Sequence, residues 1–167
     1  NFKYQLIIII INMSEIKDEI KDYFFENPTK KMRVRQIERE IKVPLPSAIR
    51  YAKELEKESI LKSEIVADVK LFSANRSSKK FLIEKRGFNL SSLYDCGLIE
   101  AFITEYSNPP IILFGSYSRG EDIEESDIDI YVQSTSNPKI KLDKYEKQLS
   151  RKIQLFSYSN LEKIENK

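Results

Sequence analysis

The stretch from Ile111 to Val132 constrains the fold of this 167-residue chain more than any other part of it. An apolar run predicts a short strand that ends at Gly115-Ser116, and an alternating run that contains Asp127 and Asp129 predicts a second strand. Side chains two residues apart on a strand project from the same face, so the two carboxylates point together. Paired carboxylates beside a Gly-Ser turn can hold Mg²⁺ and the phosphates of a nucleotide.

The residues of this stretch have distinct expected roles. Gly115 has no side chain, so phosphate oxygens can approach the backbone N–H groups, and Ser116 adds a hydroxyl donor. Asp127 and Asp129 are the expected metal ligands. Arg119 is equally compatible with a phosphate contact and with an ordinary surface salt bridge.

This motif, Gly115-Ser116 followed by Asp127-x-Asp129, resembles the nucleotidyltransferase superfamily of DNA polymerase β, in particular its minimal, antitoxin-like branch. The resemblance implies transfer of a nucleoside monophosphate from a nucleoside triphosphate, ATP first among them, to a protein or RNA hydroxyl. It implies Mg²⁺ or Mn²⁺ as cofactor, catalytic and metal-binding roles for both aspartates, and nucleotide binding by Gly115, Ser116 and Arg119. Minimal relatives often work beside a helical HEPN-type partner protein.

The family usually carries a third carboxylate on the strand after the next helix. Here that helix is expected over 142–152 and that strand over 153–156, so the third position falls on Gln154. A glutamine amide is neutral and cannot act as a general base. No Asp or Glu lies between Glu146 and Glu162, so a small shift of the strand does not restore a carboxylate.

Composition restricts the chemistry further. The chain has no His, and Cys96 is its one cysteine, so His-based catalysis and intrachain disulfides are excluded and a cytoplasmic location is expected. Charge is uneven: residues 14–90 carry +5, residues 91–137 carry −8 and residues 138–167 carry +4. The acidic segment holds the paired aspartates, and the basic segments could meet a polyanion.

The first twelve residues differ from the rest. Their apolar run, Leu6 to Ile11, is too short to cross a bilayer, which takes about 20 residues. No membrane association is therefore expected. Met13 and the N-cap residue Ser14 open a regular helix pattern, so residues 1–12 are interpreted as an upstream extension.

The next segment, residues 13–75, predicts a helix, two more helices separated by a turn, and then two short strands. This is the order of a winged helix-turn-helix domain, and the run from Val43 to Leu61 resembles that family's turn and recognition helix. The third helix, from Pro46 to about Glu58, is expected to bury Ala48, Ile49, Ala52 and Leu55. The outward candidates for DNA contact are Ser47, Arg50, Tyr51 and Lys70.

The sequence therefore predicts an α+β chain: a winged helix-turn-helix, a helical linker over 76–110 and a minimal nucleotidyltransferase domain with a mixed sheet over 111–167. Two alternatives remain open. Gln154 is consistent with a degenerate site in a DNA-binding transcriptional regulator. The chain could instead serve mainly as an antitoxin-like docking protein, as a homodimer or with a HEPN-type partner.

Overall fold

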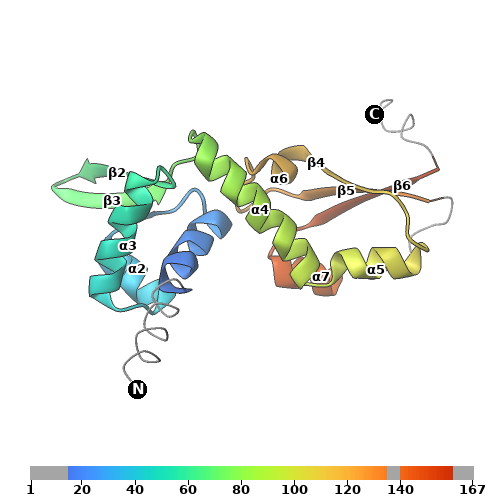
Figure 1. The fold of residues 1–167 in the computed structure, drawn as a ribbon, viewed down its shortest axis with the longest axis horizontal. Coiled ribbons are helices and arrows are strands. Elements are labelled where there is room, and N and C mark those ends of the chain that lie inside the picture. The colour runs from blue at the N-terminus through green and yellow to red at the C-terminus, as the bar shows by residue number, and fades with distance from the viewer. Residues whose placement is uncertain (1–14, 135–139, 160–167) are drawn as a thin grey trace, which may run out of the picture. The chain divides into compact units, whose positions relative to one another are not determined.

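A computed structural model describes residues 15–134 and 140–159 of the chain. The expectations for residues 1–12, Met13, Ser14 and Glu162 lie outside these described residues. The chain forms two compact units that divide between Phe81 and Leu82. Figure 1 shows the helices and strands of both units.

The first unit contains three helices and a small sheet. Its helices span residues 15–26, α2 (Val34–Ile41) and α3 (Leu45–Lys57), and its strands are β1 (Lys31–Met32), β2 (Leu61–Val66) and β3 (Val69–Ala74). The strands lie in the order β1-β3-β2 and both pairings are antiparallel. β1 was not predicted from the sequence, since two residues are too few to give a periodic pattern.

The β2–β3 connection is a two-residue hairpin. Val66 pairs with Val69, and the intervening Ala67 and Asp68 both have positive φ angles, 47° and 61°. Two central residues with positive φ define a type I′ turn, whose twist matches that of the flanking strands. This turn therefore fixes the register of the hairpin.

The buried face of α3 differs from the predicted one. Ala48, Tyr51, Ala52 and Leu55 are buried, whereas Ile49 is 38% exposed. The prediction that Tyr51 points outward to contact DNA is wrong, because only 4% of this residue is exposed. Positions 48, 51, 52 and 55 follow the i, i+3, i+4, i+7 spacing of one helical face, and Ile49 lies off that stripe.

The second unit is built on a mixed three-stranded sheet. Its strands are β4 (Ile111–Phe114), β5 (Ile128–Gln133) and β6 (Ile153–Tyr158), and the helices are α4 (Lys79–Asp95), α5 (Leu98–Glu105), α6 (Gly115–Arg119) and α7 (Asp143–Leu149). β5 is the central strand, antiparallel to β4 and parallel to β6. The sequence analysis did not anticipate α6, a single short helix that starts at the Gly-Ser pair.

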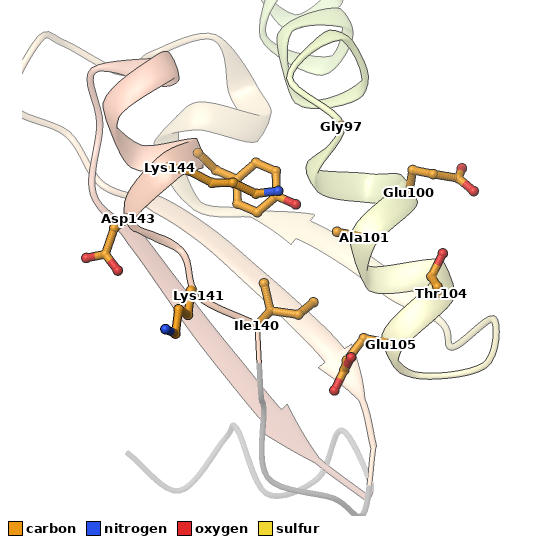
Figure 2. Close-up of a pocket in the computed structure, with 10 residues that line it drawn as sticks. Gly97, Glu100, Ala101, Thr104, Glu105, Ile140, Lys141, Asp143 and Lys144 are labelled. Atoms are coloured by element: carbon orange, nitrogen blue, oxygen red, sulfur yellow. The ribbon is translucent and has the colours of Figure 1, made fainter.

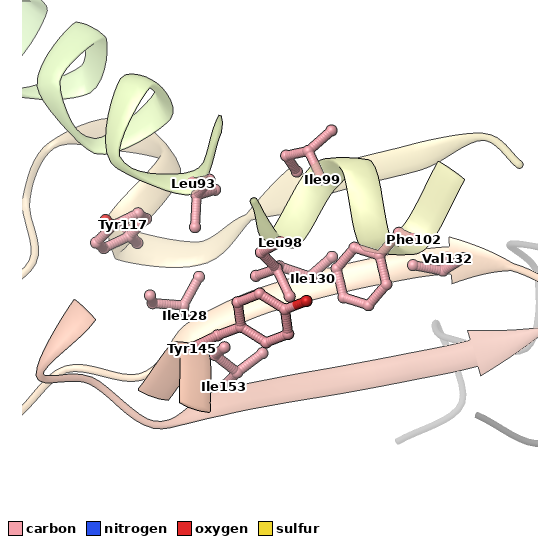
Figure 3. Packing of buried hydrophobic residues seen from close by; sticks show 10 residues of the cluster. All are labelled: Leu93, Leu98, Ile99, Phe102, Tyr117, Ile128, Ile130, Val132, Tyr145 and Ile153. Atoms are coloured by element: carbon pink, nitrogen blue, oxygen red, sulfur yellow. The ribbon is translucent and has the colours of Figure 1, made fainter. Parts of the chain in front are cut away.

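Helices cover one face of this sheet. The core there contains apolar side chains of β5, of α5 and of α7, among them Ile128, Ile130, Phe102 and Tyr145 (Figure 3). Since side chains alternate along a strand, Asp129 projects to the opposite face from Ile128 and Ile130. The helical layer thus fixes which face carries the paired aspartates.

Several helices and strands deviate from their expected limits. The helix expected over 142–152 is shorter, Asp143–Leu149, and it stops at Ser150, which has a φ of 51°. The following strand is longer and continues to Tyr158. α5 and all but the first turn of α4, which were expected in a linker, fall on the second unit's side of the division at Leu82. Leu93, Leu98 and Phe102 from these helices belong to the core of that unit.

Within residues 15–134 and 140–159, none of the helices combines the length and the apolar character that a membrane crossing requires.

Candidate functional site

The paired aspartates lie where β5 begins. Asp127 comes directly before the strand and Asp129 is its second residue. Asp129 is directly opposite Phe114 of β4 and Gln154 of β6. Directly paired residues share a face of a sheet, so Asp129 and Gln154 project together. Both aspartates are half-buried, whereas Gln154 is exposed.

Gly115 fits closely against one of these carboxylates. Its φ is +72°, a left-handed conformation that strongly favours glycine. A Cβ atom at this position would overlap the Oδ2 atom of Asp129. Both the backbone angle and the lack of space therefore require a glycine here. Ser116 follows in α6 and is half-buried, and the Ser118 hydroxyl donates a hydrogen bond to the Gly115 carbonyl at 2.9 Å.

The electrostatics of the pair favour a bound cation. Burial raises the pKa of Asp129 above its ordinary value, and the nearby Asp127 carboxylate raises it further. Two like charges on one sheet face repel each other, and a divalent cation between them would relieve that repulsion.

Gln154 contacts the aspartate pair directly. Its Nε2 atom donates a hydrogen bond to Oδ2 of Asp127 at 2.6 Å. The position expected for a third carboxylate thus lies within the site and carries a neutral amide. Glu146 is the nearest carboxylate before Gln154 in the sequence. It accepts hydrogen bonds at the start of β6, from the backbone N–H of Ile153 at 3.0 Å and from Lys152 at 2.8 Å.

Arg119 contacts Glu121, which is not one of the paired aspartates. Its Nε atom donates to Glu121 at 2.7 Å, and both side chains are largely exposed. Its contact in this structure is thus the surface salt bridge that the sequence left open.

The remaining candidates for DNA contact lie in the first unit. Ser47 is half-buried and Arg50 is exposed, paired with Glu54 at 2.9 Å. Lys70 is paired with Glu56 at 2.9 Å, and its Nζ lies 4.8 Å from the centre of the Phe72 ring.

Sequence reasoning missed a buried polar network next to α6. Lys85 of α4 donates to Asp122 at 2.8 Å, and Asn89 donates both to Asp122 and to the Tyr117 carbonyl, each at 2.8 Å. Lys85 and Asp122 are each 1% exposed, and Arg151 lies 4.0 Å from Asp122. Burial lowers the pKa of Lys85, although its contacts with Asp122 oppose that shift.

The network holds the loop that connects α6 to β5. Gly120, at the end of α6, has a φ of +69°, and a Cβ there would come within 2.6 Å of the Leu82 carbonyl oxygen of α4. The backbone of this loop is therefore pressed against α4. The sequence contained a signal for this network. Lys85 and Asn89 lie on the same helical stripe as Phe81 and Leu93, and these two apolar residues are buried.

Two pockets are found in the second unit. One of about 420 Å³ is lined by Asp127, by the turn before it and by residues of α7 and the start of β6. A larger one of about 790 Å³ lies between α5 and the segment from Ile140 to Tyr145, as Figure 2 shows, and includes neither paired aspartate. The smaller of these two pockets opens beside Asp127.

The protein alone does not provide a complete metal cage. Among the described residues, no group of three or more His, Cys, Asp and Glu side chains is placed to hold an ion. Mg²⁺ is commonly bound by one or two carboxylates together with water and substrate phosphates. The pair formed by Asp127 and Asp129 fits that kind of site.

Comparison with known proteins gives one match. Residues 96–165 match the family described as nucleotidyltransferase domain. This match supports a nucleotidyltransferase domain in the C-terminal part of the chain and, in general terms, transferase activity. Its range begins at Cys96, ahead of the expected domain start at 111, and spans the Gly-Ser pair, both aspartates and Gln154. Comparisons with curated proteins and with solved structures returned no match.

Proposed function

We propose that the chain is a Mg²⁺-dependent nucleotidyltransferase that transfers a nucleoside monophosphate from a nucleoside triphosphate to a protein or RNA hydroxyl. One observation carries this proposal: Asp129 packs against Gly115, a position that requires glycine, while Asp127 lies two residues before it at the start of β5. ATP is the first nucleotide to test, and Mn²⁺ is the alternative ion.

In this mechanism, Asp127 and Asp129 would hold a divalent cation, which would supply neutralising charge for the phosphates and for the transition state. The backbone at Gly115 and the hydroxyl of Ser116 orient the phosphates. The acceptor oxygen bonds to the α-phosphorus, the bond from that phosphorus to the bridging oxygen breaks, and pyrophosphate leaves. Since Gln154 cannot take a proton, the acceptor's proton passes to solvent.

The direct test is incubation of the full chain with α-³²P-labelled nucleoside triphosphates, Mg²⁺ or Mn²⁺, total RNA and lysate protein. Asp127→Asn and Asp129→Asn should each reduce label transfer by at least about 100-fold, because removing an outer partner of a metal ligand alone costs 10- to 100-fold. Asp95→Asn is the matched control, since it removes an exposed carboxylate at the end of α4 that lines neither pocket. Equal transfer by all three variants would reject the proposal.

We also propose that the first unit is a winged helix that contacts DNA through Ser47, Arg50 and Lys70. The order of its helices and the β2–β3 hairpin support this, and Tyr51 is removed from the proposed surface because it is buried. Arg50→Ala should weaken binding to duplex DNA at low salt, measured by fluorescence anisotropy. Arg35→Ala, an exposed arginine of α2, is the control. DNA binding that is unchanged by Arg50→Ala would contradict this assignment.

The alternative function is a catalytically degenerate regulator or an antitoxin-like docking protein. The bond from Gln154 to Asp127 favours it, because a neutral amide stands where a carboxylate is expected. DNA binding without measurable affinity for Mg²⁺-nucleotide would support the regulator. A stable complex with a HEPN-type protein, or a stable homodimer, in the absence of nucleotide would support the docking role. A cytoplasmic location is part of both proposals.

A further inference from the structure

The number of ions in the site depends on which carboxylate oxygens are free. Sites with two metal ions hold them about 3.5–4 Å apart. In the common bridging mode, a carboxylate presents one of its oxygens to each of the two ions. The state of the four oxygens of Asp127 and Asp129 therefore indicates how many ions the pair can hold.

One oxygen of Asp127 already has a partner. Oδ2 accepts the hydrogen bond from Gln154 Nε2 at 2.6 Å. An ionised carboxylate can only accept hydrogen bonds, so the amide nitrogen, and not the amide oxygen, must face it. The strand pairing that places Gln154 beside Asp129 holds this amide in position. Oδ1 is thus the oxygen of Asp127 with both lone pairs open to an ion, whereas one of the two lone pairs of Oδ2 is already used.

One oxygen of Asp129 is also restricted. Oδ2 lies so close to the Gly115 backbone that a Cβ atom at Gly115 would overlap it. An ion with its own shell of water and phosphate oxygens has less room on that side. Asp129 thus presents mainly its other oxygen, and each aspartate has one oxygen that is less open for bridging.

Among the described residues, no other carboxylate takes the place of a third metal ligand. Within residues 15–134 and 140–159, no third Asp or Glu joins the pair to form a metal-binding group.

We propose that the site binds a single divalent cation, between Asp127 and Asp129, and that Gln154 sets this number by occupying one oxygen of Asp127. This inference rests on the proposed function. Gln154 is here a positioning residue: it orients Asp127 and withholds the charge that a second ion would need. Replacing its amide by a carboxylate removes the hydrogen bond donor and adds two ligand oxygens.

The test uses the full chain, Mn²⁺ and a nucleoside triphosphate analogue with a methylene group between the α- and β-phosphates. Electron paramagnetic resonance separates isolated Mn²⁺ from two ions close enough for their spins to couple. The wild type should give one bound Mn²⁺ without spin coupling. Gln154→Glu should bind two, with the coupled signal. Gln133→Glu adds the same charge at an exposed residue at the far end of β5 and should keep one ion.

The outcomes separate this inference from the proposed function. Two coupled ions in the wild type, or one ion in Gln154→Glu, would overturn the single-ion inference and leave the nucleotidyltransferase proposal in place. Absence of bound Mn²⁺ from the wild type and from both variants would overturn the two together.

Discussion

The second unit contains a buried aspartate, Asp122, and a more accessible pair, Asp127 and Asp129, and the surroundings of their charges differ. Asp122 is almost fully buried, but Lys85 and Asn89 each donate to it at 2.8 Å, so its charge is compensated. Asp127 and Asp129 are more accessible but stand together as like charges, and the pKa of Asp129 is raised by burial and by its neighbour. The charge of Asp122 is thus balanced within the fold, whereas the charges of Asp127 and Asp129 repel each other.

This difference separates a carboxylate that is paired within the fold from the two carboxylates of the proposed site. A buried charge that is fully paired and hydrogen-bonded favours one packing of its surroundings. Removing one of its partners lowers the free energy of unfolding. A pair of carboxylates that repel each other weakens the fold slightly and gains its balance from a ligand. Four variants test the comparison, from the largest expected effect to the smallest.

Lys85→Met should reduce the free energy of unfolding by about 3–5 kcal/mol, since it removes the closer cation of the buried Asp122 and leaves only Arg151, 4.0 Å away. Urea denaturation of the full chain measures this. The double variant Lys85→Met/Asp122→Asn should recover part of the loss, because the uncompensated charge is gone. A change within about 0.5 kcal/mol for the single variant would show that the pair is not structural.

Gly120→Ala should destabilise the second unit by more than about 2 kcal/mol. A left-handed φ costs a non-glycine residue roughly 1–2 kcal/mol, and the added Cβ would also collide with the Leu82 carbonyl oxygen. Gly87→Ala is the matched control. It lies inside α4 with nothing within 4 Å of an added Cβ, so it should stabilise the protein by about 0.5–1 kcal/mol. Equal effects of the two substitutions on thermal unfolding would contradict the tight contact at Gly120.

Asp22→Asn extends the comparison to the first unit. Burial, with contributions from Asp18 and Glu26, raises the pKa of Asp22 to about 6, against an ordinary value of 3.8. The folded state therefore holds this proton more tightly than the unfolded state, and stability falls as pH rises from about 4 to about 6. After allowance for solvent screening, Asn should add about 1 kcal/mol at pH 7 and remove this pH dependence. Identical pH profiles of unfolding for the variant and the wild type would refute it.

Asp129→Asn should change the fold least and the function most. Removing one of two repelling charges should leave the midpoint of thermal unfolding unchanged or raise it by at most about 2 °C in the absence of metal. Mn²⁺ and nucleotide should stabilise the wild type but not this variant. A clear loss of stability in the metal-free variant would place Asp129 with Asp122, among the structural carboxylates.

The sequence predicted the site better than its surroundings. The alternating run around Asp127 and Asp129 and the strand position of Gln154 follow from local periodicity, and in the structure these three residues lie together. The network around Asp122 depends on contacts between residues about 30 positions apart, and such pairings leave little local pattern. The predicted buried face of α3 included Ile49 and left Tyr51 outside, whereas in the structure Tyr51 lies on the buried stripe and Ile49 lies off it.

Gln154 lies exposed on β6, an outer strand of the described sheet, so its side chain can change with little cost to folding. Glutamine and glutamate codons differ by a single base. A lineage of such proteins could therefore pass between the amide and the carboxylate at this position by one mutation, without crossing an unfolded intermediate. The number of metal ions proposed for this site would then be a readily evolvable trait, separable from the inheritance of its fold.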